Sequence, residues 1–154
     1  MQFPTPAGLP LKDFRISHRD NIMLVGSCFA ANIGNKLLDS KFNVVQNPFG
    51  VQYNPFSIAT VLERVAGGES FTASSGELLC HNGKWHSMMH HGDFSRDSME
   101  ELLECINSSL ANAHKAAEEC NTLIVTFGTA YVYYRNSDGS IAGNCHNLPG
   151  NMFT

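Results

Sequence analysis

The sequence is poor in positive charge and in long apolar runs, and each shortage excludes a class of protein. Its 154 residues hold 10 lysines and arginines against 14 aspartates and glutamates, for a formal net charge of −4. Because no basic stripe is present, neither nucleic acid nor an anionic membrane surface is expected as a partner. No apolar run approaches the roughly 18 residues that a membrane-spanning helix needs.

Signs of export and of disulfide bonding are also missing. Residues 1–6 have neither the charged segment nor the apolar segment of a secretory signal. The five cysteines are an odd number without a close pairing pattern, which favours reduced thiols. We therefore expect one soluble, cytoplasmic domain, whose 43% of hydrophobic residues is enough for a buried core.

The sequence does contain alternating strand-like and helix-like segments, which predict an α/β fold. Short apolar runs predict strands at 21–25, 42–45 and 123–127, and apolar residues at helical spacing predict helices at 29–40, 55–67 and 99–119. Phe29, Ile33 and Leu37 mark the apolar face of the first helix. Residues 1–20 are expected to be an irregular lead-in, and the turn at 136–139 predicts a hairpin.

The most informative segment is Gly26-Ser27-Cys28-Phe29-Ala30, which links the first predicted strand to the first predicted helix. Backbone N–H groups at a helix N-terminus favour a thiolate or a developing oxyanion. Ser27 and Cys28 are thus alternative nucleophiles. In a purely structural alternative, Ser27 caps the helix and Cys28 is a small buried packing residue.

Distinctive loops follow each predicted strand, at Gly26, Asn47 and Gly128. Because open α/β sheets place their sites at the carboxyl ends of strands, these loops are expected to converge.

Four ordered motifs resemble the GSCFA family, a bacterial group placed among the SGNH (GDSL-like) hydrolases. They are Gly26–Ala30, Asn47–Pro55, Phe127–Tyr133 and the segment Asn144-Cys145-His146 before Leu148-Pro149. The resemblance implies an SGNH-like, flavodoxin-type three-layer sandwich with a parallel sheet. Because the family runs further, the resemblance also implies that residues 1–154 are the N-terminal portion of one C-terminally truncated domain. The remainder of that domain would then be a partner, and residues 1–154 alone are expected to lack ester turnover.

The resemblance also implies roles for individual residues. Cys28 falls on the third position of the superfamily's Gly-Asp-Ser pattern, where the nucleophile stands. Gly50 matches a glycine whose N–H would join that of Cys28 in an oxyanion hole, although a turn glycine is the structural alternative.

Further positions depart from the family and superfamily patterns. Ala130 stands where the superfamily has an asparagine donor, which Thr129 or Asn144 would replace. His146 is the strongest histidine for a site role, with a backbone-capping histidine as the alternative. Asn147 stands where the family motif has lysine.

The implied function is hydrolysis of an ester, or acyl transfer from it, through a covalent acyl-enzyme. The substrate would be an O-acylated carbohydrate or a small ester. The alternative is a non-catalytic module that binds a glycan or acyl ligand on the same fold, motivated by the missing asparagine donor.

One cluster has residue types that bind metals, and it consists of Cys80, His81, His86, His90 and His91. His86 and His90 would suit zinc if their segment were helical. Gly83 and Gly92 indicate a loop or strand instead, so we expect neither a metal nor another cofactor.

Overall fold

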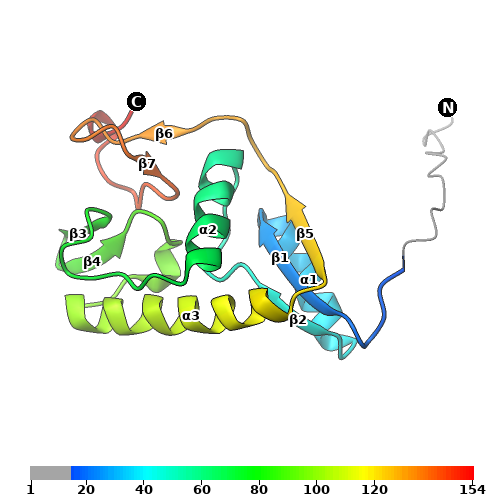
Figure 1. The fold of residues 1–154 in the computed structure, drawn as a ribbon. Helices are drawn as coiled ribbons and strands as arrows, with labels where there is room; N and C mark the ends of the chain where they lie inside the picture. Colours follow the sequence, from blue (N-terminus) through cyan, green and yellow to red (C-terminus); the bar gives the residue numbers. More distant parts are fainter. Residues whose placement is uncertain (1–14) are drawn as a thin grey trace, which may run out of the picture.

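The computed structural model describes residues 15–154, so most of the predicted lead-in over residues 1–20 lies outside it. Strands β1 (Asn21–Gly26), β2 (Asn43–Gln46) and β5 (Thr122–Thr126) form a parallel sheet in the order β2-β1-β5 (Figure 1). The predicted mixed α/β fold with a parallel sheet is therefore confirmed.

The central strand β1 is buried on both faces, as its uninterrupted apolar run requires. Met23 and Val25 pack in the core beneath helices α2 (Pro55–Gly67) and α3 (Met99–Glu119). Ile22 and Leu24 point the other way, toward helix α1 (Cys28–Asp39). Figure 1 shows this layering, with α1 on one face of the sheet and α2 and α3 on the other.

The helix boundaries follow local capping chemistry. The Ser27, Asn54 and Ser98 side chains each accept a backbone N–H at the start of α1, α2 and α3 respectively. Helix α2 has Pro55 in its first turn and ends at Gly68, which adopts a left-handed conformation. All three helices lie within about one residue of their predicted bounds.

The predicted apolar face of α1 is wrong at one position. Phe29 is 61% exposed, whereas Ala30 is fully buried against Ile22 and Leu24. A strict spacing of four drifts around a helix of 3.6 residues per turn, so the buried stripe runs through Ala30, Ile33 and Leu37.

Two hairpins lie beyond the sheet. Strands β3 (Leu78–His81) and β4 (Lys84–Ser87) pair antiparallel, as do β6 (Tyr133–Tyr134) and β7 (Ile141–Ala142), which confirms the predicted hairpin. Short 3-10 helices span Gly92–Phe94 and Gly150–Met152. A small apolar cluster of Met88, Ala142 and Leu148 joins the two hairpin regions, which are neighbours in Figure 1. Among residues 15–154, no helix has the length and apolar character to cross a membrane.

Candidate functional site

The turn after β1 depends on a glycine. Gly26 has a φ of +147°, and a Cβ built on it would lie 2.1 Å from the carbonyl oxygen of Thr126. Any side chain would therefore clash with the neighbouring strand β5. Gly26 brings the backbone of the turn against β5 at the carboxyl edge of the sheet.

The three predicted loops converge at this edge. The Gly26 N–H donates to Oδ1 of Asn47 at 2.8 Å. The Gln52 N–H donates to the Gly26 carbonyl, and the Gly128 N–H donates to the Tyr53 carbonyl, both at 2.8 Å. Backbone contacts thus connect the loops that follow β1, β2 and β5.

Ser27 is a structural cap with little exposed surface. Its side chain is buried, with 5% of the residue exposed, and its Oγ accepts the Phe29 N–H at 3.3 Å. The same oxygen lies 3.1 Å from Oγ1 of Thr126, which also accepts the Ser27 N–H at 3.1 Å. The predicted capping role of Ser27 is confirmed, and its hydroxyl is already engaged within the fold.

Cys28 has the opposite environment. It is the first residue of α1 and is exposed to solvent as a free thiol. The alternative in which Cys28 is a buried packing residue is therefore wrong. Because the first N–H groups of a helix have no partner within the helix, they can interact with negative charge on a nearby sulfur.

Gly50 lies in the loop after β2 with a φ of +80°. Its N–H donates to the Asn47 carbonyl at 2.7 Å, and a Cβ built on it would meet the His91 Cβ at 2.2 Å. Gly50 is thus needed for the turn itself. Its N–H could serve an oxyanion only by exchanging its present acceptor, and that role stays a prediction.

Thr129 and Asn144 come together in one cavity. The cavity has a volume of about 420 Å³, and its lining includes Tyr53 and Tyr131. Thr129 Oγ1 accepts the Tyr131 N–H, and Asn144 Oδ1 accepts the His146 N–H. No charged side chain is found among the described residues that line it. The cavity is connected to the turn through Tyr53, whose ring would contact any side chain at Gly128.

His146 lies in a neighbouring cavity. Its Nε2 is 2.8 Å from the Ser87 carbonyl, which fixes Nε2 as the protonated nitrogen of the neutral ring. Burial lowers the pKa of His146, although the bond to Ser87 raises it. His86, with its ring centroid 4.7 Å away, lowers the pKa further. The hydrogen bonds found for His146 in residues 15–154 join it to Ser87 and Asn144, not to Ser27 or Cys28.

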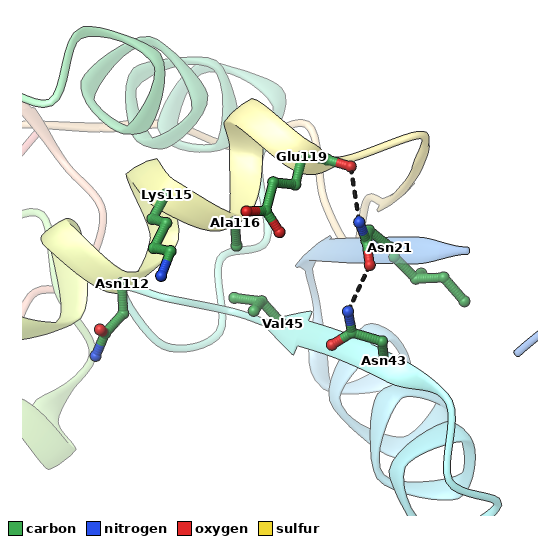
Figure 2. Close-up of a pocket in the computed structure, with 8 residues that line it drawn as sticks. Asn21, Asn43, Val45, Asn112, Lys115, Ala116 and Glu119 are labelled. Atoms are coloured by element: carbon green, nitrogen blue, oxygen red, sulfur yellow. Dashed lines mark hydrogen bonds between the residues drawn. The ribbon is translucent and has the colours of Figure 1, made fainter. Parts of the chain in front are cut away.

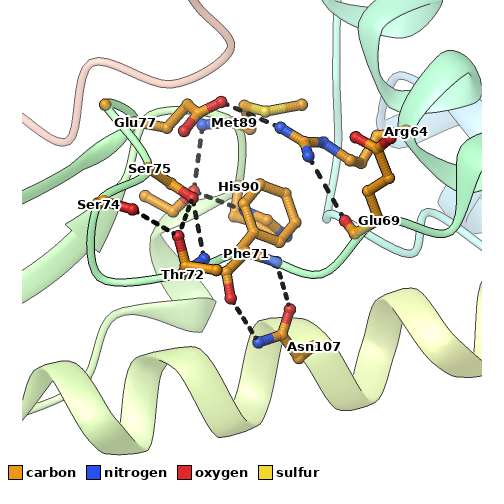
Figure 3. Close-up of polar contacts among 12 residues, drawn as sticks. Arg64, Glu69, Phe71, Thr72, Ser74, Ser75, Glu77, Met89, His90 and Asn107 are labelled. Atoms are coloured by element: carbon orange, nitrogen blue, oxygen red, sulfur yellow. Dashed lines mark hydrogen bonds and ion pairs between the residues drawn. The ribbon is translucent and has the colours of Figure 1, made fainter.

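His90 is part of the core. Its ring is fully buried, stacks on Phe49 at 4.2 Å, and lies with Nδ1 2.7 Å from the Ser87 hydroxyl. Figure 3 shows the surrounding contacts, including Arg64, whose guanidinium lies 4.6 Å from the centroid of Phe71. Burial lowers the pKa of His90 to about 3, with smaller contributions from other positive groups.

The histidine-rich stretch is not helical. His86 belongs to strand β4 and His90 to the turn that follows, so the i,i+4 ligand arrangement considered above is wrong. Within the described part of the chain, no three His, Cys, Asp or Glu side chains are grouped to hold a metal ion.

A further cavity opens at the opposite edge of the sheet. It has a volume of about 170 Å³ and lies among the amino ends of β1 and β2 and the end of α3. Figure 2 shows Asn21 donating from Nδ2 to the Glu119 carbonyl, at 3.1 Å, and Lys115 on the same rim. None of the predicted site residues lies there.

Sequence reasoning missed the residues that hold the turn in place. Thr126 binds Ser27 through its hydroxyl, Asn47 caps the Gly26 N–H with its side chain, and Tyr53 packs beside Gly128. Asn47 and Tyr53 fall within the Asn47–Pro55 motif, which could have pointed to a role for them at the site. Thr126 had no such signal, because its role depends on a parallel pairing about 100 residues away in the chain.

Comparison with known proteins gave one match. The sequence model of the GSCFA family matches residues 21–154, most of the chain. Neither the search of curated proteins nor the search of solved structures found a match.

Proposed function

This chain belongs to the GSCFA family, and we propose that the complete protein hydrolyses an ester, or transfers its acyl group, through Cys28. One observation carries the proposal: Cys28 is exposed at the first residue of α1, where three loops meet at the carboxyl edge of the sheet. Such an edge is where open α/β sheets bind ligands.

Cys28 is favoured over Ser27 because of what each side chain already does. The Ser27 hydroxyl is buried and bonded to Thr126 and to the start of the helix. Its use as a nucleophile would break these contacts. The Cys28 sulfur is free and accessible, and a thiol is a stronger nucleophile than a neutral hydroxyl.

In the proposed reaction, the Cys28 thiolate attacks the carbonyl carbon of the ester. The carbon–oxygen bond to the alcohol breaks, a thioester forms on Cys28, and the alcohol leaves with a proton. Water then hydrolyses the thioester, or a second alcohol accepts the acyl group. The N–H of Cys28, joined by that of Gly50 once released from Asn47, would stabilise the oxyanion. A histidine from a later part of an SGNH-like domain would move the protons.

The substrate class is proposed as an O-acylated carbohydrate or a small ester. The uncharged cavity beside Tyr53 supports a neutral substrate, since burying an unpaired charge there would be costly. Its volume of about 420 Å³ is within the range of ligand sites. The five free cysteines support a reducing, cytoplasmic location.

Single-turnover ester hydrolysis by the full-length protein tests the assignment. We expect Cys28→Ala to lower the rate by about a hundredfold or more, the effect of losing a covalent nucleophile. Ser27→Ala is the matched control and should retain most of the rate per folded molecule. If neither substitution lowers turnover to that extent, the nucleophile is elsewhere and the proposal is wrong.

A non-catalytic binding module is the second candidate. Ala130 at the superfamily's asparagine position and the internal bond of the Gly50 N–H both favour it. Treatment with an activated-ester probe followed by mass spectrometry separates the two candidates. An adduct on Cys28 supports the enzyme, whereas saturable ligand binding without an adduct supports the module.

A further inference from the structure

The cavity that contains His146, separate from the one beside Tyr53, is lined by basic side chains. Lys84 and His86 come from β4, His91 follows that strand, and His146 comes from the C-terminal loop. We call this space, of about 470 Å³, the histidine cavity. The rest of its lining is Gly92, Ser95, Asn144 and Asn147, so the described residues contribute no carboxylate to its wall.

The imidazoles are held in fixed orientations. His86 Nδ1 lies 2.7 Å from the Ser95 hydroxyl, and His146 Nε2 lies 2.8 Å from the Ser87 carbonyl. His91 Nδ1 accepts the Asp93 N–H at 3.4 Å and lies 3.0 Å from the Asp93 carboxylate. These contacts leave Nε2 of His91 without a hydrogen-bond partner in the described residues, whereas the His86 ring also bonds to the His81 backbone. Preoriented donors of this kind lower the cost of binding an acceptor-rich ligand.

Existing ion pairs at the cavity are weak competitors. Lys84 pairs with Asp97 at 3.5 Å, and His91 lies beside Asp93, with which it forms an ion pair only when protonated; these two aspartate side chains are 82% and 87% exposed. Ion pairs in such high-dielectric surroundings contribute little. A ligand oxyanion could therefore replace either aspartate without a large loss of stability.

Positive charge in the histidine cavity is self-limiting. Burial lowers the pKa of both His86 and His146, and neighbouring positive groups add to the effect. The charged or titratable groups near these rings are His81 and Lys84 on the hairpin, His90 and His91 after it, Asp93, Arg96 and Asp97 beyond, and Cys145 in the C-terminal loop. A bound anion would relieve the mutual repulsion, so protonation and anion binding would strengthen each other.

We propose that the histidine cavity binds the phosphate group of a small organic phosphate. Lys84 and His91, together with the side-chain amides of Asn144 and Asn147, suit a group with three or more acceptor oxygens better than a single carboxylate. Lysine is a common point-charge partner of phosphate. The cavity is also larger than inorganic phosphate needs, which leaves room for the organic part. This site is independent of the proposed ester chemistry at Cys28.

Binding is tested by following the histidine ring signals in NMR during titration of the intact chain with glycerol phosphate, inorganic phosphate and acetate. We expect saturable shifts at His86, His91 and His146, with glycerol phosphate and phosphate about tenfold tighter than acetate, since their charge is higher. Equal affinity for acetate, or shifts that never saturate, would overturn the proposal. Tighter binding of glycerol phosphate than of inorganic phosphate would show that the organic part is bound. The reverse order would overturn the inference that the ligand is an organic phosphate.

Variants and pH provide the second test. Lys84→Gln and His91→Asn should each weaken phosphate binding by about tenfold, through the loss of one charged contact and of one ring donor respectively. Asparagine at position 91 retains an acceptor for the Asp93 N–H. Lys115→Gln, at the opposite edge of the sheet, is the matched control and should change affinity less than about twofold.

Sulfate does not titrate near neutrality, so its affinity should rise about fivefold or more between about pH 7.5 and about pH 5.5 as the histidines take up protons. Unchanged sulfate affinity, or an equal effect of Lys115→Gln, would refute the site.

Discussion

Ser27 and Cys28 are neighbours in the chain, yet their side chains have different surroundings. The Ser27 hydroxyl is enclosed between α1 and Thr126, whereas the Cys28 sulfur is exposed at the start of the helix. The Ser27 hydroxyl is therefore used within the fold, whereas Cys28, which falls on the nucleophile position of the superfamily pattern, is exposed to solvent.

Cysteine alkylation tests this difference. We expect iodoacetamide to label Cys28 faster than Cys80, although both are exposed, because helix amides interact favourably with an anionic sulfur. Cys145 should react at least about tenfold more slowly than Cys28, since burial raises the pKa of the Cys145 thiol. Mass spectrometry of partly labelled protein gives the rates. Equal rates at Cys28 and Cys80 would show that the position of Cys28 at the helix N-terminus does not raise its rate of alkylation.

The burial of His90 in the core predicts that the folded protein loses stability in acid. The folded protein keeps this ring neutral down to a pKa of about 3, whereas in the unfolded chain the ring takes up a proton near the ordinary histidine pKa of 6.5. The unfolded state thus binds more protons between these values, and the free energy of unfolding falls as pH falls through this window. His90 contributes about 1.4 kcal/mol per pH unit.

Urea unfolding at several pH values measures that slope. His90→Gln should be less stable than the wild type at neutral pH, because the stack on Phe49 is lost. Its stability should nevertheless fall less steeply in acid, since no proton is taken up at position 90 on unfolding. His18, which stacks on Phe42 far from this core, gives the matched control His18→Gln. Equal slopes for wild type and His90→Gln would contradict the prediction.

At the scale of elements, the strand-to-helix turn after β1 is the least tolerant of change. Gly26→Ala should lower the free energy of unfolding by about 3 kcal/mol or more, because the Cβ would overlap the Thr126 carbonyl and the φ is unfavourable. Gly76→Ala is the matched control: nothing lies within 4 Å of its added Cβ, so a change of about 0.5 kcal/mol or less is expected. Thermal or urea unfolding compares the two. A Gly26→Ala protein as stable as Gly76→Ala would mean that the turn relaxes.

The elements themselves could be predicted because local chemistry sets them. Ser27, Asn54 and Ser98 cap their own helices within three residues, and Gly68 ends α2 by its own conformation. Phe29 shows the limit, since the side of α1 that meets the sheet depends on how Ala30 packs on β1.

The candidate site could be predicted only in part. The convergence of the three loops follows from the parallel sheet and was expected. The use of the Ser27 hydroxyl by Thr126 and the burial of His90 depend on contacts between distant parts of the chain. The separation of His146 from the turn likewise depends on where the C-terminal loop packs, which no local pattern records.

At the scale of the whole molecule, residues 15–154 contain three apolar clusters of unequal size. The largest lies between the sheet and α2 and α3, a smaller one lies under α1, and Met88, Ala142 and Leu148 join the two hairpin regions. The third cluster has few members, and the β6–β7 hairpin that it holds has strands of only two residues each. Regions with so few buried contacts open below the cost of global unfolding.

Hydrogen exchange can separate local from global opening. Amides of β7 and of residues 143–148 should exchange with a lower opening free energy and a smaller urea dependence than those of β1, and Leu148→Ala should lower the opening free energy of these amides further. Ile106→Ala is the matched control, since Ile106 is fully buried in the largest cluster. It should lower the opening free energy of the sheet amides by about 2–5 kcal/mol and leave that of the C-terminal region nearly unchanged, because the local opening keeps Ile106 buried. If β1 and β7 had equal opening free energies and equal urea dependence, the C-terminal region would unfold together with the sheet. The histidine cavity and the cavity beside Tyr53, whose walls both include Asn144, would then be as stable as the core rather than able to open by themselves.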